Sequence, residues 1–123
     1  MYQISVEQDF DAAHFLKGYR GKCEAVHGHR FRVVVKIESS RLNDIGIAYD
    51  FADLKQHLRD ILSRFDHICL NDIPPFDKIN PSSENLATTI YGELKAKLTG
   101  APVSLAGVEV WESPQSGVAY SPD

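Results

Sequence analysis

Two histidines separated by a glycine, His27 and His29, are the residues of this chain best placed to do chemistry. Their neighbours alternate between apolar and polar as in a β-strand, where side chains two positions apart point to the same side. Both imidazoles can therefore converge on one ion. Gly28 leaves the other side of the strand bare, which suits a close approach of substrate or backbone.

A third histidine, His14, ends an earlier alternating segment and lies on its apolar parity. His14, His27 and His29 are thus predicted to point inward together. Three such imidazoles are typical of a catalytic zinc site, which keeps a fourth position open for water or substrate. The alternative is a set of ordinary core or rim histidines whose hydrogen bonds are satisfied within the protein.

A candidate acid–base residue, Cys23, lies four positions before His27 and directly after Lys22. A thiol close to a lysine and a metal ion ionises readily and can act as a base or nucleophile. The alternatives are a buried small side chain or a fourth zinc ligand. The adjacent Glu24 is either a second acid–base candidate or a solvated loop carboxylate. Because adjacent side chains usually diverge, we expect at most one of the pair to face the metal.

Two further carboxylates, those of Asp66 and Glu112, are candidate site residues. Asp66 precedes His67, and a carboxylate beside an imidazole can orient it and raise its basicity. Glu112 has the parity of Val108 and Val110, so it closes an apolar strand face and needs a donor-rich partner. The guanidine-like edge of a heterocycle would supply one through a bidentate contact. Alternatively, the strand has already reached solvent at Glu112.

The segment from His14 to Arg32 is locally basic in an otherwise acidic chain. Its basic residues outnumber its one acid, Glu24, and they favour a phosphorylated or anionic small substrate. A solvated charged loop is the competing interpretation. The basic residues are Lys17, Arg20, Lys22, Arg30 and Arg32.

Hydrophobic periodicity predicts the elements that position these residues and puts Phe51 on the apolar face of the first helix. Cys69 is predicted to lie in the core. Asp50 is a plausible N-cap of the first helix, and Asp72 to Pro81 contains three prolines and reads as a loop. The order β-β-α-α-β-β predicts an α+β fold with an antiparallel sheet and both helices on one face. The predicted strands are 2–14, 29–38, 103–112 and 118–120, and the predicted helices are 51–65 and Ser82 or Ser83 to Leu98.

Composition sets the broad class. The 123 residues fit one domain spanning 1–123, with 43% hydrophobic and 24% charged residues as in ordinary globular proteins. A net charge of −4 argues against general nucleic-acid binding, and no apolar run is long enough to span a membrane. The two cysteines and the absence of a secretory signal at the N-terminus predict a cytoplasmic protein with reduced thiols.

In combination, these motifs resemble the 6-pyruvoyl-tetrahydropterin synthase / 6-carboxytetrahydropterin synthase family, along the whole chain. The upstream Ala-Ala-His and the Cys-x-x-x-His-Gly-His block are together highly specific. The matching motifs are Phe10-Asp11-Ala12-Ala13-His14, Cys23-x-x-x-His27-Gly28-His29, Tyr49-Asp50-Phe51-x-Asp53-Leu54-Lys55, Asp66-His67-x-x-Leu70-Asn71, Asn80-Pro81-Ser82-Ser83-Glu84-Asn85-Leu86-Ala87 and Val110-Trp111-Glu112.

The resemblance implies a tunnelling fold whose protomers form barrel-like trimers that stack into hexamers. It implies that the three histidines named above bind Zn²⁺. It also makes Cys23 the catalytic thiol, with Asp66 and His67 as its partners. Glu112 would anchor the pterin ring, and Ser82 and Ser83, where the family often has threonine, would line the pterin pocket.

The resemblance further implies a lyase-like enzyme acting on 7,8-dihydroneopterin triphosphate. Our first choice is 6-carboxytetrahydropterin synthase in a 7-deazaguanine (queuosine) pathway. The alternatives are 6-pyruvoyl-tetrahydropterin synthase and a folate-branch enzyme that makes 6-hydroxymethyl-dihydropterin. Folate-branch relatives use a glutamate near the catalytic cysteine, and Cys23-Glu24 offers both side chains.

Two other classes remain open: a non-catalytic pterin- or metal-binding module, and a hydrolase that uses zinc-bound hydroxide. The presence of Cys23, Asp66 and His67 argues against the binding module, which has no need of a proton relay.

Overall fold

The long antiparallel pair of β1 (Tyr2–His14) and β2 (His27–Ser39) forms the centre of the sheet. Its register sets Tyr2 opposite Ser39 and His14 opposite His27, so the site histidines meet at one end of the pair. The computed structural model describes residues 1–18 and 25–123.

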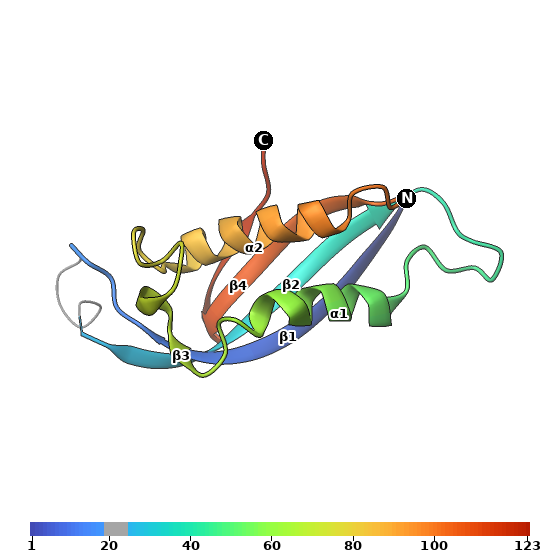
Figure 1. The fold of residues 1–123 in the computed structure, drawn as a ribbon. Coiled ribbons are helices and arrows are strands. Elements are labelled where there is room, and N and C mark those ends of the chain that lie inside the picture. Colours follow the sequence, from blue (N-terminus) through green and yellow to red (C-terminus); the bar gives the residue numbers. More distant parts are fainter. Residues whose placement is uncertain (19–24) are drawn as a thin grey trace.

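The other elements complete a five-stranded sheet in the order β3-β1-β2-β4-β5. Both helices cover the same face of this sheet (Figure 1). No helix in the described ranges is long and apolar enough to cross a membrane. The remaining elements are α1 (Phe51–Leu62), β3 (Ile68–Cys69), the 3₁₀ turn η2 (Leu70–Asp72), α2 (Ser83–Lys97), β4 (Ser104–Ser113) and β5 (Ser116–Tyr120).

The predicted fold class is confirmed, with one addition. The two-residue strand β3 pairs parallel to β1, with Ile68 opposite Ala12 and Cys69 opposite Ala13. Two residues are too short for an alternating pattern, so the sequence does not reveal this strand, and the sheet is mixed rather than purely antiparallel. Cys69 is consequently half-buried at the sheet edge instead of lying in the core.

The core lies between the sheet and the two helices. Even positions of β1 and odd positions of β2 face the helices, and Phe10 stacks on Phe31 with ring centroids 4.9 Å apart. Helix α1 contributes Leu54 and Leu58 to this core. Phe51, which helical spacing also placed on the apolar face, is exposed at the first position of α1.

Polar caps begin both helices where the sequence predicts. The Asp50 side chain accepts a hydrogen bond from the Ala52 N–H at 2.7 Å. The Ser82 hydroxyl accepts one from the Asn85 N–H at 3.1 Å, so Ser82 rather than Ser83 is the N-cap of α2. This cap fixes where α2 begins beside the histidines.

Two glycines provide a stability test of the fold. A Cβ at Gly117 would collide with the indole ring of Trp111, which is held by a hydrogen bond to Glu109 and lies beneath Arg32. Gly117→Ala should therefore lower the free energy of unfolding by about 1–3 kcal/mol. Gly92 lies in α2 with open space around it, so Gly92→Ala should raise that free energy by up to about 1 kcal/mol. Urea denaturation measures both changes, and equal effects would contradict the packing described.

Candidate active site

The three predicted histidines converge at the end of the β1–β2 pair. Their ring centroids lie 4.6 Å (His14–His27), 4.8 Å (His27–His29) and 5.3 Å (His14–His29) apart. Possible ligand atoms of these residues and of Glu112 all lie within 4.8 Å of one another. The structure therefore brings together a four-residue cluster that could hold a metal ion.

Backbone carbonyls orient two of the rings. Nδ1 of His14 lies 2.8 Å from Pro81 O, and Nδ1 of His27 lies 2.7 Å from Ala25 O. An N–H at Nδ1 leaves the Nε2 lone pair free to face the cluster, the usual arrangement of a metal-binding histidine. Burial lowers the pKa of His14, against the opposing effect of the Pro81 carbonyl, and so favours the neutral imidazole that a metal requires.

The cluster contains donor atoms without partners. Among the described residues, Nε2 of His14 and Nε2 of His29 are buried and have no hydrogen-bond partner. Glu112 Oε2 lies 3.1 Å from His29 Nε2, but the contact lacks hydrogen-bond geometry. Buried nitrogens of this kind are costly unless something binds them, so the donor set fits a metal ion such as zinc.

Glu112 reaches the histidines from β4. Its Oε2 lies 4.0 Å from His14 Nε2, and its side chain is 36% exposed, against 3% for His14. It therefore stands at the solvent side of the cluster. Its predicted role as pterin anchor stays a prediction, and the structure adds a fourth metal ligand as a second possible role. The parity of Glu112 with Val110 indicated its face, but its distance from the histidines depends on the β2–β4 register.

Asp66 and His67 form a separate cluster with Asp11. Asp66 Oδ1 lies 3.0 Å from His67 Nδ1 and also accepts the Asp11 N–H at 2.9 Å. This backbone hydrogen bond, together with the contact to His67, lowers the pKa of Asp66 and keeps it a carboxylate. Asp66 is thus able to orient the His67 ring. The catalytic role of the pair stays a prediction.

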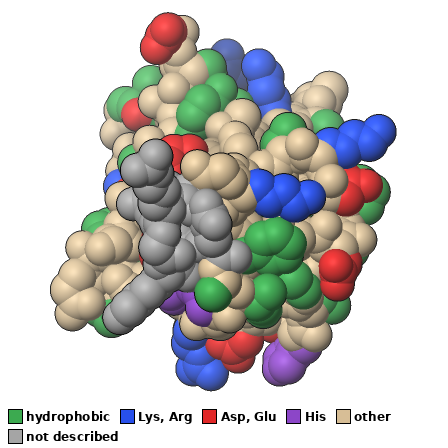
Figure 2. All heavy atoms as spheres, turned by 90° about the vertical axis from the view of Figure 1, so that its left-hand side faces the viewer, with side chains coloured by type: hydrophobic (Ala, Val, Ile, Leu, Met, Phe, Trp, Pro, Cys, Tyr) green, Lys and Arg blue, Asp and Glu red, His purple; other side chains and the backbone are tan. Residues whose placement is uncertain are grey.

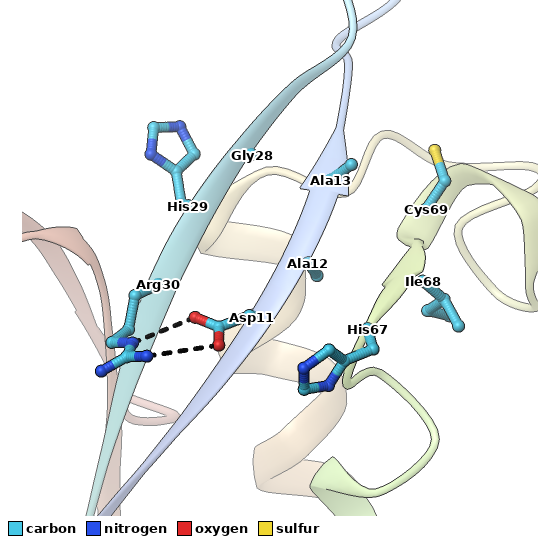
Figure 3. A pocket seen from close by; sticks show the side chains of 9 residues that line it. All are labelled: Asp11, Ala12, Ala13, Gly28, His29, Arg30, His67, Ile68 and Cys69. Carbon is cyan, nitrogen blue, oxygen red and sulfur yellow. Dashed lines mark hydrogen bonds and ion pairs between the residues drawn. The ribbon is translucent and has the colours of Figure 1, made fainter.

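His67 borders a hollow of about 550 Å³ that is also lined by Ala13 and Gly28 (Figure 3). In this view, β1 and β2 lie between the His29 ring and His67. The described part of one chain does not bring the pair onto the histidine cluster. Cys23 and Glu24 lie outside the described residues, so their predicted roles stay predictions.

His67 has a left-handed backbone, with φ of 61°. Its N–H donates to Asp11 O at 2.6 Å, which holds this conformation. A non-glycine residue there costs about 1 kcal/mol.

We therefore expect His67→Gly to be more stable than His67→Ala by about 1 kcal/mol, although both variants lose the imidazole. At His57, inside α1, the order should reverse, because glycine is the poorer helix former. Chemical denaturation of the four variants decides this, and the same order at both positions would contradict it.

The two serines predicted to line the pterin pocket differ in environment. Ser82 uses its hydroxyl as the helix cap. Ser83 is buried, and among the described residues its Oγ has no hydrogen-bond partner. The structure thus leaves Ser83 as the serine with a hydroxyl available to a ligand, while binding by either residue stays a prediction.

The sequence predicts that five basic residues give a positive field near the metal, and this prediction is wrong for Arg30 and Arg32. Arg30 and Arg32 alternate with His29 and lie on the sheet face away from the helices, where Arg30 pairs with Asp11 and Arg32 with Glu7, each at 3.1 Å. Arg20 and Lys22 lie outside the described residues. Figure 2 faces the end of the molecule where β1 ends, and histidine, acidic and basic side chains share that surface.

The fold and the cluster define an α+β protein with a candidate metal site where β1 ends and β2 begins. The model of the 6-pyruvoyl tetrahydropterin synthase family matches residues 3–123. The chain therefore belongs to the 6-pyruvoyl tetrahydropterin synthase family. This membership supports the prediction that the protein is a lyase-type enzyme.

Individual relatives agree with this membership. A 6-carboxy-5,6,7,8-tetrahydropterin synthase of Synechocystis sp. is 38% identical, over 98% of this chain and 93% of its own. A protein of the same name from Haemophilus influenzae is 30% identical, over 98% of this chain and 99% of its own. The structure of Caenorhabditis elegans 6-pyruvoyl tetrahydropterin synthase superposes with a TM-score of 0.88 at 27% identity, covering 99% of this chain and 96% of that one.

Proposed function

We propose that this chain is a zinc-dependent 6-carboxy-5,6,7,8-tetrahydropterin synthase acting on 7,8-dihydroneopterin triphosphate. The observation that carries the proposal is the convergence of three histidines, two of them with buried, unpartnered Nε2 atoms, in a family whose similar members bear that name. We further propose a place in a 7-deazaguanine (queuosine) pathway in the cytoplasm. The experiment that tests the function is identification of the product formed from this substrate.

In this proposal His14, His27 and His29 hold the zinc. Bound zinc would polarise hydroxyl and carbonyl oxygens of the substrate side chain. Glu112, at the solvent side of the cluster, accepts hydrogen bonds from the pterin ring, and the charge-assisted contact fixes its orientation. The Ser83 hydroxyl adds a further polar contact.

The chain's own acid–base groups move the protons. Cys23 takes or returns a proton between the pterin ring and the side chain. His67 acts as its partner, while the Asp66 carboxylate, 3.0 Å from Nδ1, holds the ring in one orientation. Because β1 and β2 separate His67 from the His29 ring within one chain, a second copy is the simplest source of a His67 that faces the metal.

Self-association into a hexamer, a dimer of trimers, is therefore part of the proposal. Strand β5 is the last strand of the described sheet, and β1 pairs on its outer side with β3 only at Ala12 and Ala13. Such edges invite pairing with another chain. Large apolar side chains are also exposed near the start of β1, in the segment before α1 and at the first position of α1. These are Met1, Tyr2, Leu42, Ile45, Ile47 and Phe51.

Complementation tests whether two copies share a site. His29→Ala and His67→Ala should each be inactive, but their co-assembly should restore up to about a quarter of the wild-type sites, because one in four random pairings joins two intact halves. Light scattering of the wild type should give the mass of six chains. A monomer at micromolar concentration, or a mixture as inactive as its components, would count against the shared site.

A further inference from the structure

Beyond His14, the backbone of β1 continues into a segment that is held by two side-chain amides. Phe15 N–H donates to Asn71 Oδ1 and Phe15 O accepts from Asn71 Nδ2, both at 3.0 Å. Lys17 N–H donates to Asn80 Oδ1 and Lys17 O accepts from Asn80 Nδ2, both at 2.9 Å. Each asparagine thus offers one acceptor and one donor to a single residue, as a neighbouring strand would.

The two amides prolong a row of contacts along the outer edge of β1. Asp11 bonds through its N–H to Asp66 Oδ1 and through its carbonyl to the His67 N–H. The strand β3 then pairs with Ala12 and Ala13. Asn71 and Asn80 follow at Phe15 and Lys17. This row connects the Asp66–His67 pair with the segment around His14 through consecutive hydrogen bonds.

The amides also flank the contact that orients His14. Phe15, held by Asn71, follows His14 directly, and Asn80 precedes Pro81, whose carbonyl lies 2.8 Å from His14 Nδ1. The Asn80 carbonyl itself accepts from Asn85 Nδ2 at 2.8 Å, which ties it to the first turn of α2. The backbone next to each partner of the His14–Pro81 contact is therefore fixed by the hydrogen bonds of an asparagine side chain.

From this geometry we infer that Asn71 and Asn80 are positioning residues for the metal site. They hold the backbone on either side of the His14 Nδ1–Pro81 O contact, and so fix the direction of His14 Nε2. The inference rests on the proposed zinc function. Groups that orient a metal ligand typically contribute about 10–100-fold to metal affinity, which sets the size of the expected effect.

The test compares zinc affinity, measured with a competing chromophoric chelator, in Asn71→Ala, Asn80→Ala and wild type. We expect both variants to keep the native circular dichroism spectrum but to bind zinc at least about 10-fold more weakly. Their kcat should fall while KM for the pterin triphosphate changes little. If an alanine variant does not fold, the near-isosteric Asn71→Asp and Asn80→Asp keep the acceptor, lose the donor and should weaken zinc binding likewise.

The matched control is Asn43→Ala. Asn43 Oδ1 accepts from the backbone N–H groups of Ile45 and Ile47, both at 3.0 Å, in the loop before α1. Its loss should lower stability without changing zinc affinity. If the Asn71 and Asn80 variants lose stability as Asn43→Ala does but bind zinc as tightly as wild type, the positioning role is overturned and the proposed function is left intact. A wild-type protein that binds no zinc would overturn both.

Discussion

Cys23→Ala should reduce 6-carboxytetrahydropterin formation by about 10²–10⁴-fold, the usual contribution of a general acid or base. Zinc should stay bound, because the three histidines that we assign as its ligands are unchanged. Glu24→Ala should be nearly silent, since the side chain next in sequence is expected to point elsewhere. Steady-state rates together with the zinc content of each variant measure this.

The same pair of variants distinguishes the folate branch. If Glu24→Ala removes 6-hydroxymethyl-dihydropterin formation while Cys23→Ala spares it, the chain is a folate-branch enzyme and our assignment is wrong. Two products, each lost with a different variant, would identify a dual-function site. If neither change affects any product, the proton relay proposed here is wrong.

Replacing a cluster histidine should remove the metal. We expect about one zinc ion per chain in the purified protein and a loss of most of it in His27→Ala or His29→Ala, because two remaining imidazoles hold zinc poorly. Activity should fall with the metal. Elemental analysis after dialysis against a weak chelator measures the zinc content.

His57→Ala is the matched control, because His57 lies in α1 beside the Tyr49 hydroxyl and outside the cluster, and it should keep its zinc. Glu112→Gln separates the two possible roles of that carboxylate. A pterin anchor should leave zinc in place and raise KM, whereas a metal ligand should lose zinc. Full zinc content in a double His27→Ala, His29→Ala variant would contradict the ligand assignment.

Much of the scaffold could be predicted because its elements carry clear periodic patterns. Alternation along β1 and β2 indicated both strands and the inward face of His14 and His29. Asp50 and the Ser82-Ser83 pair marked the helix starts. Where a pattern was too short or stood at the end of an element it failed, as at β3 and at the exposed Phe51.

The site was only partly predictable because it depends on contacts between distant segments. Parity showed which way Glu112 points, but not that β4 carries it to 3.1 Å from His29 Nε2. Arg30 and Arg32 were counted by their closeness in sequence to the histidines, whereas strand alternation puts them on the opposite face. The amide contacts of Asn71 and Asn80 join residues 56 and 63 positions apart, which no local pattern reveals.

The most direct test of the central claim is to incubate the purified zinc-loaded protein with 7,8-dihydroneopterin triphosphate and identify the product by mass spectrometry. We expect 6-carboxy-5,6,7,8-tetrahydropterin, with no product from the His27→Ala, His29→Ala double variant. Formation of only 6-pyruvoyl-tetrahydropterin or 6-hydroxymethyl-dihydropterin would contradict the assigned reaction. No turnover by a zinc-loaded, correctly assembled wild-type protein would contradict the enzymatic function itself.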